Sequence, residues 1–158
     1  MLKIKQLKLV FKHFGFSTYD LLLIGLWFDT ERLQVSCPSL ENLSIIRANN
    51  ITSLFSRQLP IAPYFSKLET LRVKSCGKLR NLMSLSVAKG LLNLRNLEIE
   101  DCESMEEVIT KEEQQQGDGI MNLFPLLDEL ELCRLPKLGA FLFDRVYSRI
   151  SISQRSED

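Results

Sequence analysis

Apolar residues recur at fixed offsets in four stretches of the chain, which begin at Leu40, Leu68, Leu94 and Leu127. Counted from these leucines, offsets −3, 0, +3, +5, +8, +11 and +14 are apolar in every copy, which gives 28 apolar residues in 28 positions. Because 45% of the chain is hydrophobic, chance gives this result with odds of about 10⁻¹⁰ before allowance for freely chosen spacings. The chain therefore contains an internal repeat.

The offsets within one copy predict its local structure. Apolar residues at +3 and +5 point the same way from a short strand, because side chains alternate along a strand. In two copies offset +8 is a small cysteine, Cys76 or Cys102, which suits a turn. Offsets +11 and +14 are spaced as in one turn of α- or 3₁₀-helix. Each unit must stack on its neighbours to bury its apolar face.

The copies are 28, 26 and 33 residues apart, which is in or just above the range of leucine-rich repeats. We therefore expect an α/β fold, a leucine-rich-repeat solenoid. Its curved parallel sheet would have short helices or irregular segments on the convex side.

The repeat also predicts the domain organisation. Residues 1–150 form a single leucine-rich-repeat domain, with a degenerate first repeat at 1–36 and four clear repeats at 37–143. Within them, the polar, glycine-ended stretch 111–119 (KEEQQQGDG) is a solvated loop that explains the longest spacing. Residues 151–158 are polar and are expected to form a flexible tail.

Two segments outside the strict pattern receive local interpretations. In the first repeat Ile4, Leu7 and Leu9 reproduce the strand, while residues 19–28 are a buried helix or strand that the pattern does not assign. After the second clear copy, residues 84–90 suit a short helix with Ser84 as N-cap and Gly90 as C-cap.

Composition narrows the class of protein. Twenty Lys+Arg balance twenty Asp+Glu, which argues against binding to nucleic acid or a membrane surface, because such binders carry a basic excess. Cys76 and Cys102 occupy equivalent core positions, which favours reduced thiols in a cytoplasmic protein. The single histidine, His13, cannot make a metal site alone. The apolar run 21–28 is too short to span a bilayer, and no small-residue cleavage site follows it.

The motifs of common enzymes are missing. The sequence lacks phosphate-binding glycine loops, the zinc-protease H-E-x-x-H motif and the hydrolase G-x-S-x-G motif. A cysteine nucleophile would have to use His13, which lies outside the repeat register. We therefore expect a non-enzymatic chain that needs no cofactor and no metal.

The positions between the apolar ones form the candidate binding surface. If +3 and +5 face the core, then +2, +4 and +6 face solvent on the concave side. From the first clear copy to the fourth, these positions change from neutral or basic to acidic; they are Asn42, Ser44, Ile46, Thr70, Arg72, Lys74, Asn96, Glu98, Glu100, Glu129, Glu131 and Cys133. The degenerate first strand adds Gln6, Lys8 and Val10.

Equal offsets in successive copies should lie side by side. Arg72 then lies beside Glu98 and Lys74 beside Glu100, and the simplest interpretation is two surface ion pairs. Glu129 and Glu131 have no adjacent cation. Because like charges opposed across a sheet are destabilising, a basic partner would relieve a cost there. The candidate partner contacts are Arg72, Lys74, Glu98, Glu100, Glu129 and Glu131. Cys133 is expected to be exposed.

Three segments carry a resemblance to a known family. Residues 65–82 (FSKLETLRVKSCGKLRNL), 91–109 (LLNLRNLEIEDCESMEEVI) and 124–141 (FPLLDELELCRLPKLGAF) resemble the C-terminal leucine-rich repeats of plant intracellular disease-resistance proteins of the coiled-coil, nucleotide-binding class. The resemblance covers residues 37–141. The F-P-x-L-x-x-L-x-L-x-x-L-P-x-L form of the fourth copy and the acidic loop before it are its most specific marks.

This resemblance implies repeats that act in the defense response by sensing a ligand or by restraining a nucleotide-driven switch. The implied partner is a protein: a pathogen effector, a host target, or a nucleotide-binding domain of the same receptor. The chain itself has no phosphate-binding loop and no coiled-coil heptads. The alternative is a leucine-rich-repeat substrate-recognition arm of a ubiquitin-ligase adaptor.

Overall fold

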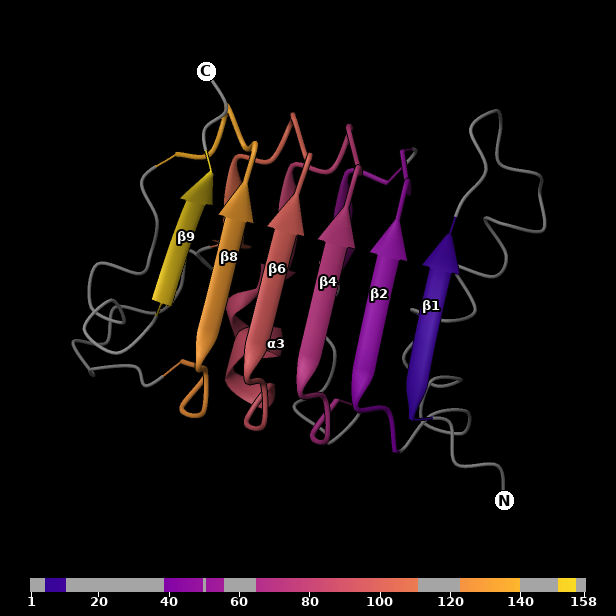
Figure 1. The fold of residues 1–158 in the computed structure, drawn as a ribbon, viewed down its shortest axis with the longest axis vertical. Coiled ribbons are helices and arrows are strands. Elements are labelled where there is room, and N and C mark those ends of the chain that lie inside the picture. Colours follow the sequence, from indigo (N-terminus) through magenta and orange to yellow (C-terminus); the bar gives the residue numbers. More distant parts are fainter. Residues whose placement is uncertain are drawn as a thin grey trace.

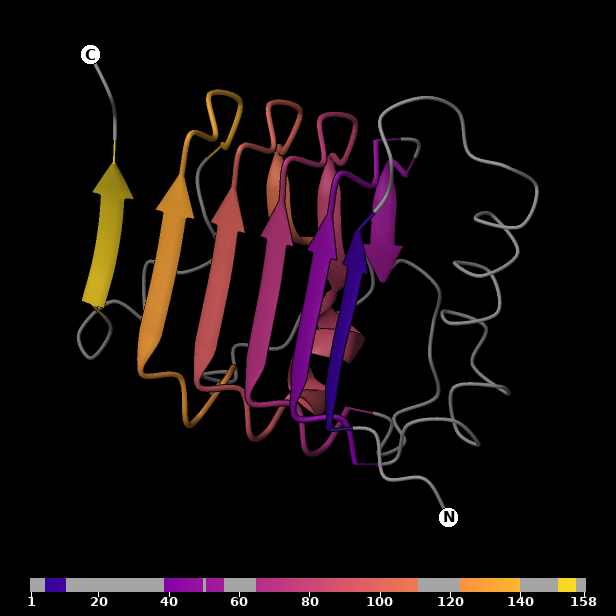
Figure 2. The same cartoon turned by 45° about the vertical axis from the view of Figure 1, so that its right-hand side comes forward.

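The computed structural model describes residues 5–10, 39–49, 51–55, 65–110, 123–139 and 151–155. Six parallel strands form one sheet in the order β1-β2-β4-β6-β8-β9 (Figure 1). Their bounds are Gln6–Val10 (β1), Asn42–Ile46 (β2), Thr70–Lys74 (β4), Asn96–Glu100 (β6), Glu129–Cys133 (β8) and Ser151–Arg155 (β9). A second parallel sheet, of β3 (Ser53–Phe55), β5 (Asn81–Ser84) and β7 (Glu107–Thr110), lies behind it (Figure 2).

The strands of the larger sheet begin and end where the repeat predicts. The four strands β2, β4, β6 and β8 each run from offset +2 to offset +6, and paired Cα atoms share the same offset, as Leu71 and Leu97 do. Side chains at +3 and +5 of these strands are at most 5% exposed. A slip of one residue would bring all of them to the solvent face. The predicted α/β leucine-rich-repeat fold is confirmed.

The side of the repeats opposite the large sheet is more regular than expected. The +14 residues Leu54, Leu82 and Val108 lie in β3, β5 and β7. The backbone pairs from repeat to repeat there: the Arg80 amide donates to the Thr52 carbonyl, and the Glu106 amide donates to the Arg80 carbonyl, both at 2.8 Å. The spacing of three between +11 and +14 fits a helical turn as well as a strand. Buried backbone groups need hydrogen-bond partners, and pairing with the next repeat provides them, which favours strands.

One helix of the described residues, α3 (Leu85–Gly90), follows β5 on this side. Ser84 is its N-cap, as predicted, and the Ser84 hydroxyl accepts a hydrogen bond from the Val87 amide at 3.4 Å. Gly90 is the last helical residue and Leu91 is the C-cap. The predicted C-terminal boundary is therefore wrong by one residue, which is within the usual fraying of helix ends.

The core between the two sheets consists of the repeat positions. The structure describes 26 of the 28, of which 23 are buried, and the others pack against the core as partly buried Ile51, Leu135 and Leu138. Cys76 and Cys102 are buried free thiols. The hydrogen bond with the Cys76 thiol, together with burial, raises the pKa of Cys102. Since only a thiolate is reactive, Cys102 serves as core.

The two outermost strands lie outside the four clear copies. In β1, Leu7 and Leu9 align with Leu43 and Ile45, so the predicted strand of the degenerate repeat is confirmed. At the other end, residues expected to be a flexible tail form β9, in which Ile152 aligns with Leu130. The outer edge of β8 offers backbone groups that a parallel strand can pair with. Backbone pairing of this kind does not require the side chains of β9 to be apolar.

Some predictions fall outside the described residues. They concern the unassigned segment 19–28, the loop 111–119, His13, and the repeat positions Cys37 and Phe141. The boundaries of a single domain at residues 1–150 stay a prediction.

A left-handed residue ends each of four strands. Five described non-glycine residues have positive φ, and four of them occupy offset +7, with φ between 52° and 62°: Arg47, Ser75, Asp101 and Arg134. In the first three, the backbone amide donates to the carbonyl of the last residue in the next strand, at 2.9 to 3.1 Å. The turn therefore costs local conformational energy and gains a hydrogen bond between repeats.

This turn can be tested at Ser75, where φ is 56°. We expect Ser75→Gly to raise the free energy of unfolding by up to about 1 kcal/mol, because glycine adopts this conformation without steric cost. Ser75→Val should lower it by about 1–3 kcal/mol, because a β-branched residue is strained there. Urea unfolding measures both values.

Ser44, within strand β2, provides the matched control. Its extended backbone favours valine over glycine, so the order of stability there should be reversed. The same order of glycine, serine and valine at both positions would contradict the role assigned to the left-handed turn.

Candidate interaction surface

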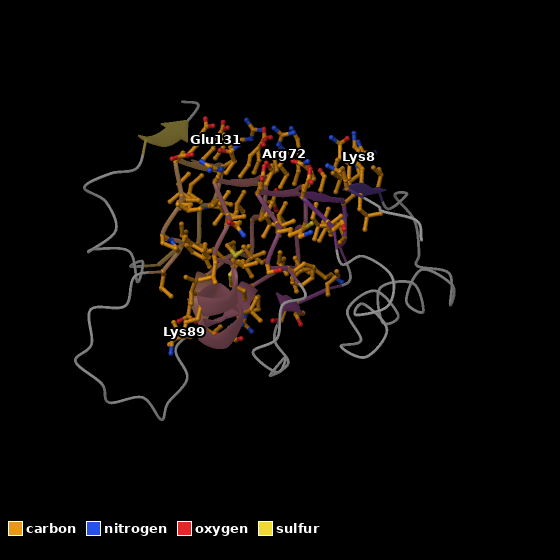
Figure 3. The ribbon with its side chains drawn as sticks, turned by 90° about the horizontal axis from the view of Figure 1, so that it is seen from below. Lys8, Arg72, Lys89 and Glu131 are labelled. Atoms are coloured by element: carbon orange, nitrogen blue, oxygen red, sulfur yellow. The ribbon has the colours of Figure 1, made fainter. Side chains whose placement is uncertain are left out.

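We call the side of the large sheet that faces away from the second sheet the open face. It carries the +2, +4 and +6 side chains of the clear repeats and the outward side chains of β1. Lys8, Arg72 and Glu131 project from this face, whereas Lys89, in the last turn of α3, lies on the opposite side (Figure 3). All six candidate contact residues are therefore at the outward offsets of β4, β6 and β8.

The two predicted cation–carboxylate pairs form between β4 and β6. Arg72 Nε lies 2.6 Å from Glu98 Oε2, and Lys74 Nζ lies 2.5 Å from Glu100 Oε2. Hydrogen bonding to Glu100 raises the pKa of Lys74. The Arg72 side chain is 60% exposed and that of Glu98 is 30% exposed, so solvent screens the pair and its worth is about 0.2–1 kcal/mol. These pairs join neighbouring repeats.

Arg134, directly after β8, is a functional neighbour that the sequence analysis missed. Its guanidinium donates to both carboxylate oxygens of Asp101, with Nη2 lying 2.9 Å from Oδ2, and it also contacts Glu100. Glu100 is therefore held between Lys74 and Arg134. The hydrogen bond from Arg134 lowers the pKa of Asp101. Asp101 and Arg134 share offset +7, which lies one position beyond the outward offsets +2, +4 and +6.

The remaining ion pairs of the described residues obey the same rule. Each joins equal offsets in successive repeats: Lys5–Glu41 at 2.9 Å, Arg95–Asp128 at 3.1 Å and Arg80–Glu106 at 2.9 Å. Arg80 also lowers the pKa of Glu106 by hydrogen bonding to it. The charged side chains thus reinforce the stacking that the core imposes.

Glu129 and Glu131 differ from the other four candidates. Glu129 aligns with Asn96 and Ser151, and Glu131 aligns with Glu98 and Ser153. Neither glutamate forms a salt bridge within the described parts of the chain. Glu98 and Glu131 are like charges side by side, which is unfavourable in a sheet. The acidic end of the open face is therefore available to a cation from outside.

The prediction that Cys133 is exposed is wrong, because the residue is only 4% exposed. Cys133 lies between β6 and β9 and aligns with Glu100 and Arg155. Its side chain is short, and β9 pairs with the edge of β8 that a flexible tail would have left open. Cys133 therefore contributes no reactive thiol to the open face.

The described residues contain no group of three or more His, Cys, Asp or Glu side chains placed to hold a metal ion. Within the same residues, no helix is long and apolar enough to cross a membrane.

Removing Arg134 should change the acid response of the chain. In the native chain the lowered pKa of Asp101 contributes stability that is present above about pH 4 and is lost as pH falls through the folded-state pKa. Arg134→Ala should raise the pKa of Asp101 toward its ordinary value and reduce this acid-dependent loss. NMR titration of the Asp101 carboxyl measures the first effect, and urea unfolding at neutral and acidic pH measures the second.

Arg47→Ala is the matched control, because Arg47 also occupies offset +7 and is exposed. It should leave the titration of Asp101 unchanged. If Asp101 titrated identically in the native chain and in the Arg134→Ala variant, the contact between Arg134 and Asp101 would have no electrostatic effect.

Charge reversal on β8 should not harm the fold. Glu129→Lys combined with Glu131→Lys should leave the thermal midpoint nearly unchanged or raise it, because a lysine at 131 replaces a like-charge contact with Glu98 by an attraction. Glu98→Lys should lower the midpoint, because it removes the partner of Arg72. Thermal unfolding followed by circular dichroism measures the midpoint of both variants and of the native chain, and a large drop for the double variant on β8 would show that its carboxylates are structural.

The comparisons with known proteins agree with the geometry. Residues 27–151 match the family model described as plant disease resistance protein RPS2-like, leucine-rich repeats. No curated protein and no solved structure gives a significant match. The matched region spans the four clear copies and the strands from β2 to β8, and it covers more than half of the chain. The chain therefore belongs to the family of leucine-rich repeats of RPS2-like plant disease resistance proteins.

Proposed function

We propose that the chain is a protein–protein interaction region that acts in plant defense, as the ligand-sensing or autoinhibitory repeats of a disease-resistance protein. Leucine-rich repeats of this family are generally non-enzymatic interaction modules. The family match supports this proposal over the ubiquitin-ligase adaptor. The partner is a pathogen effector, a host target or a nucleotide-binding domain of the same receptor, and we place the interaction in the cytoplasm.

The observation that carries the proposal is that the two faces of the large sheet differ in burial. The inward positions form the core, since the +3 and +5 side chains are at most 5% exposed. The outward positions form a wide, regular surface with no covering layer among the described residues. A protein partner can contact several strands of such a surface at once.

Charge identifies the part of this surface most suited to binding. Arg72, Lys74, Glu98 and Glu100 already have partners within the sheet, so a ligand would have to compete for them. Glu129 and Glu131 have no salt-bridge partner among the described residues for which a ligand would have to compete. Rim charges of this kind set association rate and partner choice more than total affinity.

The proposal can be tested with the nucleotide-binding domain of a receptor from the same family. We expect this chain and that domain to co-precipitate when expressed together in plant cells. Glu129→Lys with Glu131→Lys should weaken the association by about tenfold or more, as measured by quantitative co-immunoprecipitation and by titration of the purified proteins.

The control carries the same charge change elsewhere in the stack. Glu103 and Glu107 are exposed and form no salt bridge within the described residues, and Glu107 lies on β7 in the second sheet. Glu103→Lys with Glu107→Lys should leave the association unchanged. If the two double variants weakened the association equally, the assignment of binding to the open face would be contradicted. It would also be contradicted if the native chain and the nucleotide-binding domain did not associate.

A further inference from the structure

Exposed leucines lie in the repeat of Glu129 and Glu131, the glutamates of β8 that form no salt bridge within the described residues, and in the repeat before it. The described residues include three exposed large hydrophobic side chains: Val10 at 51%, Leu92 at 55% and Leu126 at 41%. Leu92 and Leu126 lie in the turns that lead into β6 and β8. The segments that lead into these strands lie at the lower edge of the large sheet (Figure 1). The corresponding turn before β4 carries the polar residues Ser66 and Lys67.

The apolar turns and the acidic strands therefore change together along the stack. Where the open face is basic, at β4, the preceding turn is polar. Where it is acidic, at β6 and β8, the preceding turns expose leucine. A solvated acidic surface has no need of exposed leucines, whereas a protein-binding surface combines apolar anchors with charged groups at its rim.

Resting on the proposed interaction role, we propose that this region binds an extended basic segment of a partner protein. The segment carries lysine or arginine at alternate positions, followed by apolar residues. We call the region formed by Glu98, Glu129, Glu131, Leu92 and Leu126 the β6–β8 surface.

The spacing of the surface fits an extended segment. Glu129 and Glu131 are two residues apart on one strand, so their side chains repeat at about 7 Å. Alternate side chains of an extended peptide repeat at the same distance. Leu126 lies three residues before Glu129, which places it within about 10 Å along the chain. Two basic side chains over Glu129 and Glu131 would thus bring the next outward residue of the peptide to Leu126.

Charge complementarity sets the sign of the partner. Glu131 lies beside Glu98, and Glu98 receives its cation, Arg72, from the opposite side. A basic side chain above Glu131 therefore meets two carboxylates. It replaces a repulsion between neighbouring strands by an attraction, which an acidic or neutral segment cannot do.

The probe is the nine-residue peptide S-K-S-K-S-L-S-L-S. Serine occupies every odd position, and the even positions carry two lysines followed by two leucines. We expect the full chain to bind it in a fluorescence-anisotropy titration, with an affinity that falls as sodium chloride rises from about 50 to about 200 mM. Replacing both lysines of the peptide by glutamate should abolish binding. Replacing both leucines by serine should weaken it about tenfold.

Variants of the chain test the two halves of the surface separately. Glu129→Gln with Glu131→Gln should weaken peptide binding about tenfold and reduce its salt dependence. Leu92→Ser with Leu126→Ser should weaken it about five- to tenfold and leave the salt dependence unchanged.

Matched controls remove the same groups elsewhere. Glu103→Gln with Glu107→Gln, and separately Val10→Ser, should each change the affinity by less than about twofold. An equal loss of affinity in the controls would show nonspecific electrostatic or hydrophobic binding and would overturn the proposal. An affinity that did not change on substitution of either the leucines or the carboxylates of the β6–β8 surface would overturn it too, as would a lack of binding of the lysine peptide to the native chain.

The outcome is separable from that of the interaction role itself. If the peptide fails to bind while the nucleotide-binding domain still associates through the open face, the partner chemistry proposed here is wrong and the interaction role stands. If that association is lost as well, both proposals fail.

Discussion

The pairing of parallel strands at equal repeat offsets is the constraint on which the rest of the structure depends. The leucines at +3 and +5 can enter the core in only one register, because a slip of one residue would turn them outward. Once Leu71 lies beside Leu97, every other offset is aligned as well. Most ion pairs therefore join like positions of successive repeats, as Arg72 joins Glu98 and Arg80 joins Glu106. The hydrophobic pattern thus determines the arrangement of charges.

This dependence explains which parts of the molecule could be predicted from sequence. The strands of the large sheet and the Arg72–Glu98 and Lys74–Glu100 pairs follow from side-chain alternation and equal offsets alone. The second sheet does not, because a spacing of three at +11 and +14 fits both a helical turn and an extended segment. There the choice depends on backbone partners in the neighbouring repeat. The burial of Cys133 could not be predicted, because it depends on β9. The segment that forms β9 has one apolar residue, Ile152, at a repeat position.

The turn at offset +7 escaped prediction for a different reason. A left-handed residue is usually signalled by glycine, yet these four turns use arginine, serine and aspartate. In three of the four turns, at Arg47, Ser75 and Asp101, the local cost is offset by the hydrogen bond from the backbone amide to the next strand. This bond depends on stacking and cannot be recognised from the sequence of one repeat. Asp101 and Arg134 also gain their side-chain contact from this turn, because it directs both residues toward the boundary between their repeats.

The six charged residues singled out on the open face therefore divide into two groups with different consequences. Arg72, Lys74, Glu98 and Glu100 are neighbours of opposite sign, and their contacts are explained by the stability of the stack. The two glutamates of β8 form no salt bridge within the described residues, and Glu131 lies beside the like charge of Glu98. A charge that costs stability on an exposed sheet face calls for an explanation outside the folded chain. The exposed leucines at the start of β6 and β8 require the same kind of explanation, and one basic, partly apolar partner provides it for both.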